Sequence, residues 1–214
     1  MNRTLISIFG MCLFAAAAAS AATVSVVVTD AKGKPVADAV VGLAPSGNTE
    51  IASHTPTKSI IAQRDEMFVP LVVIVRRGGE VVFTNNDTTM HQVYSFSPIK
   101  QFEFEIDKGQ VSKPVVFDKS GVAAIGCNIH DRMIAYVYVA DAPYAAITDA
   151  KGRAELHDVP AGGYRASLWH PGLPPGRPWP SMTVTVTGDS NHFGFSVSLL
   201  AADPRGMKHM HMDY

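Results

Sequence analysis

Four side chains of this sequence offer the donor atoms of a mononuclear copper site. Cys127, His130 and Met133 lie in one short run, Cys127-Asn-Ile-His-Asp-Arg-Met133, and His91 lies farther upstream. Together they supply one thiolate, two imidazoles and one thioether. A plane of two histidines and one cysteine with a weak axial methionine is the ligand set of blue-copper electron-transfer centres. The residue types and their spacing therefore predict one-electron chemistry at copper.

Each of these residues also has an ordinary structural explanation. Cys127 alone could be a small buried hydrophobe, His91 a hydrogen-bonded strand residue, and Met133 a packing residue at a strand start. Zinc suits the set less well, because its usual ligands are thiolate, imidazole and carboxylate. A Cys-His nucleophile would need a cleft and an oxyanion hole, which no accompanying motif indicates. The joint spacing favours copper, and the sequence predicts a protein that is not an enzyme.

The first 22 residues have the features of a secretory signal peptide. Arg3 provides a positive start, residues 5–19 are apolar, and Ala19-Ser-Ala21 is typical of a cleavage site. An uncleaved membrane anchor is the alternative, but the apolar run is short for a span. We expect export to a bacterial periplasm and no membrane span after cleavage. Without Cys12, the mature chain has no disulfide, and Cys127 needs burial or a metal in an oxidising compartment.

The overall composition excludes some classes of partner. Of the 214 residues, 47% are hydrophobic and 17% charged, and the formal net charge is −1. This is an ordinary globular balance, so wholesale disorder is not expected. Because there is no basic excess, the sequence does not indicate nucleic-acid binding or attraction to an anionic membrane surface.

The pattern of the mature chain is almost entirely that of β-strands. Short runs rich in β-branched and aromatic residues alternate with Gly, Pro and Asn turns, and no useful helical period follows residue 22. An all-β fold is therefore expected, with Tyr94 and Phe96 packed in a core. The strongest predicted strands are residues 24–29, 37–43, 59–62, 71–75, 80–84, 91–96, 102–106, 114–117, 121–127 and 133–140.

The two ends of the mature chain share a motif. Residues 24–43 and 147–168 both contain Thr-Asp-Ala-Lys-Gly, and they resemble the opening and later parts of carboxypeptidase-regulatory-like (transthyretin-like) β-sandwiches. Neither part looks complete alone. We therefore predict a discontinuous regulatory-like sandwich, residues 23–58 and 141–200, with a second domain inserted at residues 59–140. Consecutive units, with the first segment adding strands to the middle one, are the alternative.

The middle segment also resembles a known family. Residues 81–91, ending in His91, and residues 121–133, with their Cys-x2-His-x2-Met loop, are similar to cupredoxins, and the loop spacing is that of amicyanin. The wider run is similar to periplasmic plastocyanin-like proteins labelled as methylamine-utilization proteins. The resemblance implies a Greek-key β-sandwich with type 1 copper, an electron carrier, and the ligands His91, Cys127, His130 and Met133.

Two departures from the amicyanin pattern concern the surroundings of the ligands. Gln92 follows the first histidine where the family has an asparagine that helps to tie the ligand loops together. Asp131 follows the second histidine where the family has a proline, and Arg132 comes next. These residues change the surface that a partner would meet. The sequence thus implies a periplasmic redox protein, a dehydrogenase or a cytochrome, without naming it.

The C-terminal tail, residues 201–214, contains Met207-Lys-His-Met-His-Met212. Thioethers and imidazoles favour copper, so this tail could bind the ion, or it could be a disordered end. A copper-binding and copper-handling protein is accordingly one alternative function. A carbohydrate-binding or protein-binding β-sandwich with a vestigial copper module is another. The remaining histidines are expected in surface or structural roles: His54, His157, His170 and His192.

Overall fold

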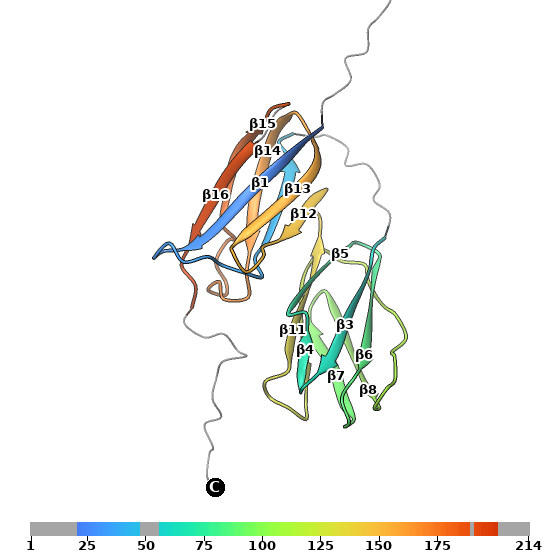
Figure 1. Cartoon of the computed structure of the whole chain (residues 1–214). Helices are drawn as coiled ribbons and strands as arrows, with labels where there is room; N and C mark the ends of the chain where they lie inside the picture. Colours follow the sequence, from blue (N-terminus) through green and yellow to red (C-terminus); the bar gives the residue numbers. More distant parts are fainter. Residues whose placement is uncertain (1–20, 48–55, 189–190, 201–214) are drawn as a thin grey trace, which may run out of the picture.

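The computed structural model describes residues 21–47, 56–188 and 191–200. The regular elements in these residues are β-strands, so the all-β prediction is confirmed. No helix in the described part of the chain is long and apolar enough to cross a membrane. The predicted signal peptide, apart from Ala21 and Ala22, and the Met/His-rich tail lie outside the described residues. The strands form four sheets, which make two sandwiches (Figure 1).

The first of these, the outer sandwich, combines strands from both ends of the described chain. One sheet has the order β13-β1-β16 and the other the order β12-β2-β14-β15. β1 pairs antiparallel with β13 and in parallel with β16, so the first strand is held between two late ones. The strands are β1 (Ala21–Asp30), β2 (Val40–Pro45), β12 (Tyr144–Ile147), β13 (Arg153–Pro160), β14 (Gly162–Trp169), β15 (Ser181–Val186) and β16 (Asn191–Val197).

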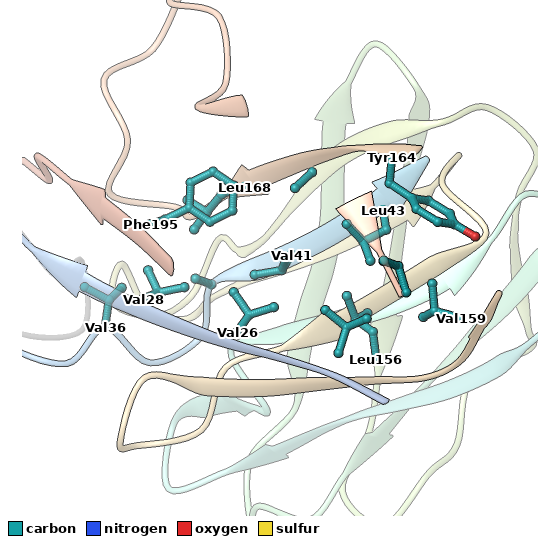
Figure 2. Close-up of a cluster of buried hydrophobic side chains, with 14 of the residues drawn as sticks. Val26, Val28, Val36, Val41, Leu43, Leu156, Val159, Tyr164, Leu168 and Phe195 are labelled. Carbon is teal, nitrogen blue, oxygen red and sulfur yellow. The ribbon is translucent and has the colours of Figure 1, made fainter. Parts of the chain in front are cut away.

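The core of the outer sandwich follows the two-residue period of its strands. In β1, alternate residues are buried, and the residues between them are exposed or half-buried. Figure 2 shows Val26 and Val28 of β1 in one cluster with Val41 and Leu43 of β2, which belongs to the facing sheet. Full burial of each such side chain is worth about 1.5–3 kcal/mol. This apolar layer therefore stabilises the joining of the two chain ends.

The inner sandwich carries the predicted metal ligands. A sheet of order β5-β11-β10-β7-β8 packs against one of order β4-β3-β6-β9. Buried side chains from both sheets fill the space between them, including Ile61, Phe83 and Ile125. The strands are β3 (Lys58–Arg64), β4 (Met67–Val69), β5 (Val72–Arg76), β6 (Gly79–Asn85), β7 (His91–Ser97), β8 (Lys100–Ile106), β9 (Val115–Phe117), β10 (Gly121–Cys127) and β11 (Ile134–Ala140).

Aromatic side chains join the two sandwiches. Tyr138 of β11 and Trp169 of β14 lie in one buried cluster, with ring centroids 5.9 Å apart. Tyr136 lies 5.4 Å from Trp169, and Trp179 lies 5.7 Å from Tyr138, centroid to centroid. The Arg76 guanidinium donates to two backbone carbonyls of the segment that leads back to the outer sandwich. The boundary is therefore a packed contact between the two sandwiches.

Tyr138, which lies at this boundary, makes the stability of the folded protein depend on pH in the alkaline range. Burial, followed by the charge of Asp141, raises the pKa of Tyr138 from 10.0 to about 12. Its stabilising contribution is thus complete below pH 10 and is lost as the pH rises towards 12, because the unfolded chain releases the proton first. We expect a loss of about 2–3 kcal/mol over this range. Urea denaturation near neutral pH and at about pH 11.5 measures the free energy of unfolding lost between the two pH values. This loss should be smaller for Tyr138→Phe than for wild type, and equal losses would contradict the prediction.

Two sequence-based expectations differ from the structure. The sequence pattern does not predict the short strand β4, which pairs antiparallel with β3. The expectation that Tyr94 and Phe96 pack in the core is wrong, since Phe96 is 66% exposed and Tyr94 is half-buried. The reason is the phase of β7, in which His91 and Val93 are buried and the intervening side chains point to the opposite face.

Candidate metal centre

The structure brings three of the four predicted ligands together. One ligand atom each from His91, Cys127 and His130 lies within 4.8 Å of the others. The Sγ atom of Cys127 is 3.8 Å from Nδ1 of His91. The two imidazole rings have centroids 5.1 Å apart and planes inclined by 62°. The donor atoms therefore converge on one small volume, as a single metal ion requires.

Strand pairing places these residues at the same end of the inner sandwich. His91 begins β7 and Cys127 ends β10, and these antiparallel strands pair with Cys127 opposite Val93. The loop between β10 and β11 carries His130 and Met133. It turns back on itself, because the Met133 backbone N–H donates to the His130 carbonyl at 3.0 Å. Three ligands thus come from one strand end and its loop, and the fourth comes from the neighbouring strand.

Met133 is buried rather than exposed at the surface. It is 2% exposed and belongs to the same buried cluster as Cys127. Both residues also line one surface cavity of about 480 Å³. A buried thioether that lines the same cavity as the thiolate suits the role of a weak axial ligand.

A carboxylate that the spacing of the ligands does not predict holds the His91 ring. His91 is fully buried, and its Nε2 lies 2.9 Å from Oδ2 of Asp87. With Nε2 donating to this carboxylate, Nδ1 is the unprotonated nitrogen and faces Cys127. Carboxylate partners of this kind fix the tautomer of a metal-ligating histidine and increase its basicity. Asp87 is therefore a positioning residue of the site.

Asp87 is itself fixed by the backbone around it. Its two oxygens accept the backbone N–H groups of Asp65 at 2.6 Å and Glu66 at 3.2 Å. Its own N–H donates to the buried Asn85 side chain, which in turn donates to two carbonyls. Burial opposes ionisation, but the hydrogen bonds from His91 and the two amides lower the pKa of Asp87 below its ordinary value. The carboxylate is thus charged and immobile beside His91.

His130 shows the clearest sign that a ligand belongs in this site. Its Nε2 lies 3.5 Å from Oε1 of Glu66, whereas its Nδ1 is buried and has no hydrogen-bond partner. A buried polar atom without a partner is costly and rare in folded proteins. A metal ion bound to Nδ1 would satisfy it, and Nδ1 of His91 is oriented toward the same place. The His130 side chain is 23% exposed, so one edge of the site meets solvent.

Gln92 ties the two ligand segments together, although the amicyanin pattern has an asparagine at this position. Its Oε1 accepts a hydrogen bond from the Asn128 side chain at 2.8 Å, and its Nε2 donates to Glu103 at 2.6 Å. Asn128 directly follows the ligand Cys127. The longer glutamine side chain therefore ties β7 to the ligand loop in this protein.

The donor set fits a type 1 copper centre. A soft thiolate, two imidazoles and a thioether are its ligands, and the Asp87 carboxylate orients the His91 ring. Zinc fits this set less well, because a thioether such as that of Met133 is not among its usual ligands. A nucleophilic cysteine is normally partly exposed, whereas Cys127 is 4% exposed and shares the hydrophobic core. Of the other histidines, His157 is exposed, lies near Thr23 and does not belong to this metal-ligand cluster. His54 lies outside the described residues.

Comparison with solved structures gives matches that each cover part of this chain. No family model matches, and no curated protein sequence matches. A purple cupredoxin from Nitrosopumilus maritimus is 22% identical, over 38% of this chain and 99% of its own, with a TM-score of 0.35. Amicyanin from Paracoccus versutus is 19% identical, over 42% and 95%, with a TM-score of 0.35. A pseudoazurin from Sinorhizobium is 20% identical, over 40% and 76%, with a TM-score of 0.33.

Proposed function

We propose that this protein is an exported type 1 copper protein of the cupredoxin class that carries single electrons between redox partners. The observation that supports this most directly is the convergence of two imidazoles and one thiolate, with an unpartnered Nδ1 on His130. Copper, when bound there, supplies a one-electron couple between Cu(I) and Cu(II). The chain's own residues would hold the ion, and Asp87 orients the His91 ring.

The scaffold suits fast electron exchange. His91 and Cys127 lie on paired strands, and Asp87 holds the outer nitrogen of the His91 ring. Ligands held in this way keep their positions when the charge of the ion changes, which reduces the reorganisation that accompanies electron transfer. The solvent-exposed edge of His130 offers one route to a partner.

The cellular setting and the partner belong to the same proposal. The signal-like N-terminus supports export to a periplasm, where a dehydrogenase or a cytochrome would exchange electrons with the site. We further infer that the outer sandwich is of the carboxypeptidase-regulatory-like type, from the repeated Thr-Asp-Ala-Lys-Gly motif at its two parts. Copper handling through the tail would rest on residues outside the described part of the chain.

The test is the visible spectrum of the mature chain after addition of Cu(II). We expect one tightly bound copper, an intense thiolate-to-copper charge-transfer band and a reversible one-electron wave. A second chain that ends at Leu200 separates the site from the Met/His-rich tail and should give the same band. A protein that stays colourless with Cu(II) would contradict the proposed function.

A further inference from the structure

We propose that the cavity beside His130 is a capture site for Cu(I), in which the Met67 thioether and Nε2 of His130 bind the ion before the buried ligands receive it. This inference rests on the proposed function, because it concerns how the type 1 site obtains its copper. It adds a residue, Met67, that lies outside the four-ligand set. Its evidence is the position of the thioether, the placement of the His130 ring, the fixed turn before Met67 and the acidic lining of the cavity.

Met67 provides a soft sulfur donor at the solvent-exposed edge of the metal centre. It is the first residue of β4, is 37% exposed and lines, together with His130, a cavity of about 350 Å³. Ile129 adds an apolar part to the same wall. Thioether ligands select Cu(I), and imidazole suits copper generally. The cavity therefore combines the two donor types that favour Cu(I).

The His130 imidazole belongs both to this cavity and to the buried site. Its Nε2 lies 3.5 Å from Oε1 of Glu66, and both residues line the cavity. Its Nδ1 is buried and has no hydrogen-bond partner. One ligand atom of His130 lies within 4.8 Å of the ligand atoms of His91 and Cys127. An ion bound to Nε2 is therefore separated from the buried donors by the His130 ring.

The turn that precedes Met67 is fixed before any ion binds. Asp65 and Glu66 form this turn, and their backbone N–H groups donate to the Asp87 carboxylate at 2.6 Å and 3.2 Å. Met67 pairs with Arg64 across the β3–β4 hairpin. Binding to groups that are already in place costs less conformational freedom. The hairpin thus holds the thioether at the cavity without a rearrangement of the backbone.

The charges of the cavity favour a cation. Of the described residues that line it, three are acidic and one is basic, namely Asp65, Glu66, Asp131 and Arg132. A cleft in which one sign of charge dominates raises the local concentration of the opposite ion and its rate of association. The Glu66 carboxylate lies beside Nε2 of His130, so a cation attracted to it arrives next to a donor atom.

The proposed loading is an exchange of ligands in which the oxidation state of copper does not change. Met67 and His130 take Cu(I) from a donor complex, and the four buried ligands then take it from Met67. The Cys127 thiol releases its proton to solvent when its thiolate binds the ion. Met67 therefore binds copper during loading and is not a ligand of the loaded protein.

The first experiment measures how fast the metal-free mature chain takes Cu(I) from its bicinchoninate complex without oxygen, followed by the loss of the colour of that complex. Met67→Leu removes the sulfur and keeps an apolar side chain of similar size at an exposed position. We expect Cu(I) uptake to become roughly three- to tenfold slower, because a soft donor of the capture site is lost. Uptake at the wild-type rate, or a wild-type chain that takes no Cu(I), would overturn the proposal.

Two controls separate the capture site from a general effect on the metal centre. In Met67→Leu, the rate of Cu(II) uptake and the reduction potential should keep their wild-type values, whereas a disturbed hairpin would change both. Met90 is 39% exposed and directly precedes the ligand His91, but it does not line the cavity. Met90→Leu should therefore take up Cu(I) at the wild-type rate. Equal slowing in the Met67 and Met90 variants would refute a site in this cavity.

The second experiment detects the capture site directly with Ag(I), a soft monovalent cation that is not oxidised under these conditions. Ag(I) is added to the Cys127→Ala chain, with and without residues 201–214, and methionine-methyl NMR is recorded. We expect the Met67 methyl signal to shift and the Met90 signal to stay in place, and an unshifted Met67 signal would contradict the proposal. Failure of the proposed function would appear separately, as a wild-type chain that gives no visible band with Cu(II), because the Ag(I) titration does not depend on that band.

Discussion

Replacing Cys127 with alanine is expected to abolish both the intense visible band and the reversible one-electron wave of the copper-loaded protein. The band requires a thiolate bound to copper, and Cys127 is the one free cysteine of the described residues. No other side chain of the cluster can replace a thiolate, since the remaining donors are imidazoles and a thioether. The measurements are absorption spectroscopy and voltammetry after addition of Cu(II) and removal of the excess.

Two controls separate loss of the ligand from other effects. Cys127 lies in the hydrophobic core, so the variant should lose roughly 1–2 kcal/mol of stability and remain folded, as circular dichroism and urea denaturation would show. His157→Ala removes an exposed histidine of the outer sandwich and should leave the band unchanged. An intense band in a folded Cys127→Ala protein would refute the ligand assignment.

The four ligands are predictable because local spacing carries most of the information. Cys127, His130 and Met133 lie in one loop at a strand end, where consecutive ligands are brought together without distant contacts. His91 needs one further step, the pairing of β7 with β10. The second-sphere carboxylates depend on more distant contacts. Asp87 meets the amides of residues 21 and 22 positions away, across the β3–β4 turn.

That turn explains why Glu66 and Asp87 escape a sequence-based prediction. β4 has only three residues, so it has too little alternation to be recognised as a strand. Asp65 and Glu66 both adopt positive φ angles, 54° and 55°, as a tight two-residue hairpin requires. An acidic pair is a weak signal for such a turn. Asp87 lies four residues before His91, and this spacing is the one local signal that could indicate the contact between Asp87 and His91.

The exposed aromatic pair shows a different limit of sequence reasoning. Residue type favours a core position for Tyr94 and Phe96, but the phase of β7 decides the matter. Because His91 has to face the interior to reach the metal, Val93 and Ser95 share its side, and Tyr94 and Phe96 share the other. The prediction that His91 is a metal ligand therefore also predicts that Tyr94 and Phe96 lie on the outer face of the strand.

Removing the Asp87 carboxylate is expected to weaken copper binding and to raise the reduction potential. In Asp87→Ala, the His91 Nε2 and the amides of Asp65 and Glu66 lose their acceptor. The affinity for Cu(II) should fall by about 10–100-fold, as for other second-sphere partners of metal-ligating histidines. A carboxylate makes His91 a stronger donor and so stabilises Cu(II) more than Cu(I). Chelator competition measures the affinity and voltammetry measures the potential.

The potential distinguishes this electronic effect from simple loss of structure. The reduction potential reflects the ratio of the affinities for Cu(II) and Cu(I), so a loosened site that weakens both equally leaves it unchanged. Asp87→Asn, which retains an acceptor oxygen without the charge, should recover part of the affinity while keeping most of the rise in potential. Asp131→Asn removes an equal charge from the exposed part of the ligand loop and should change both quantities less. Equal shifts in the Asp87 and Asp131 variants would show that only the net charge matters and that the hydrogen bond to His91 does not.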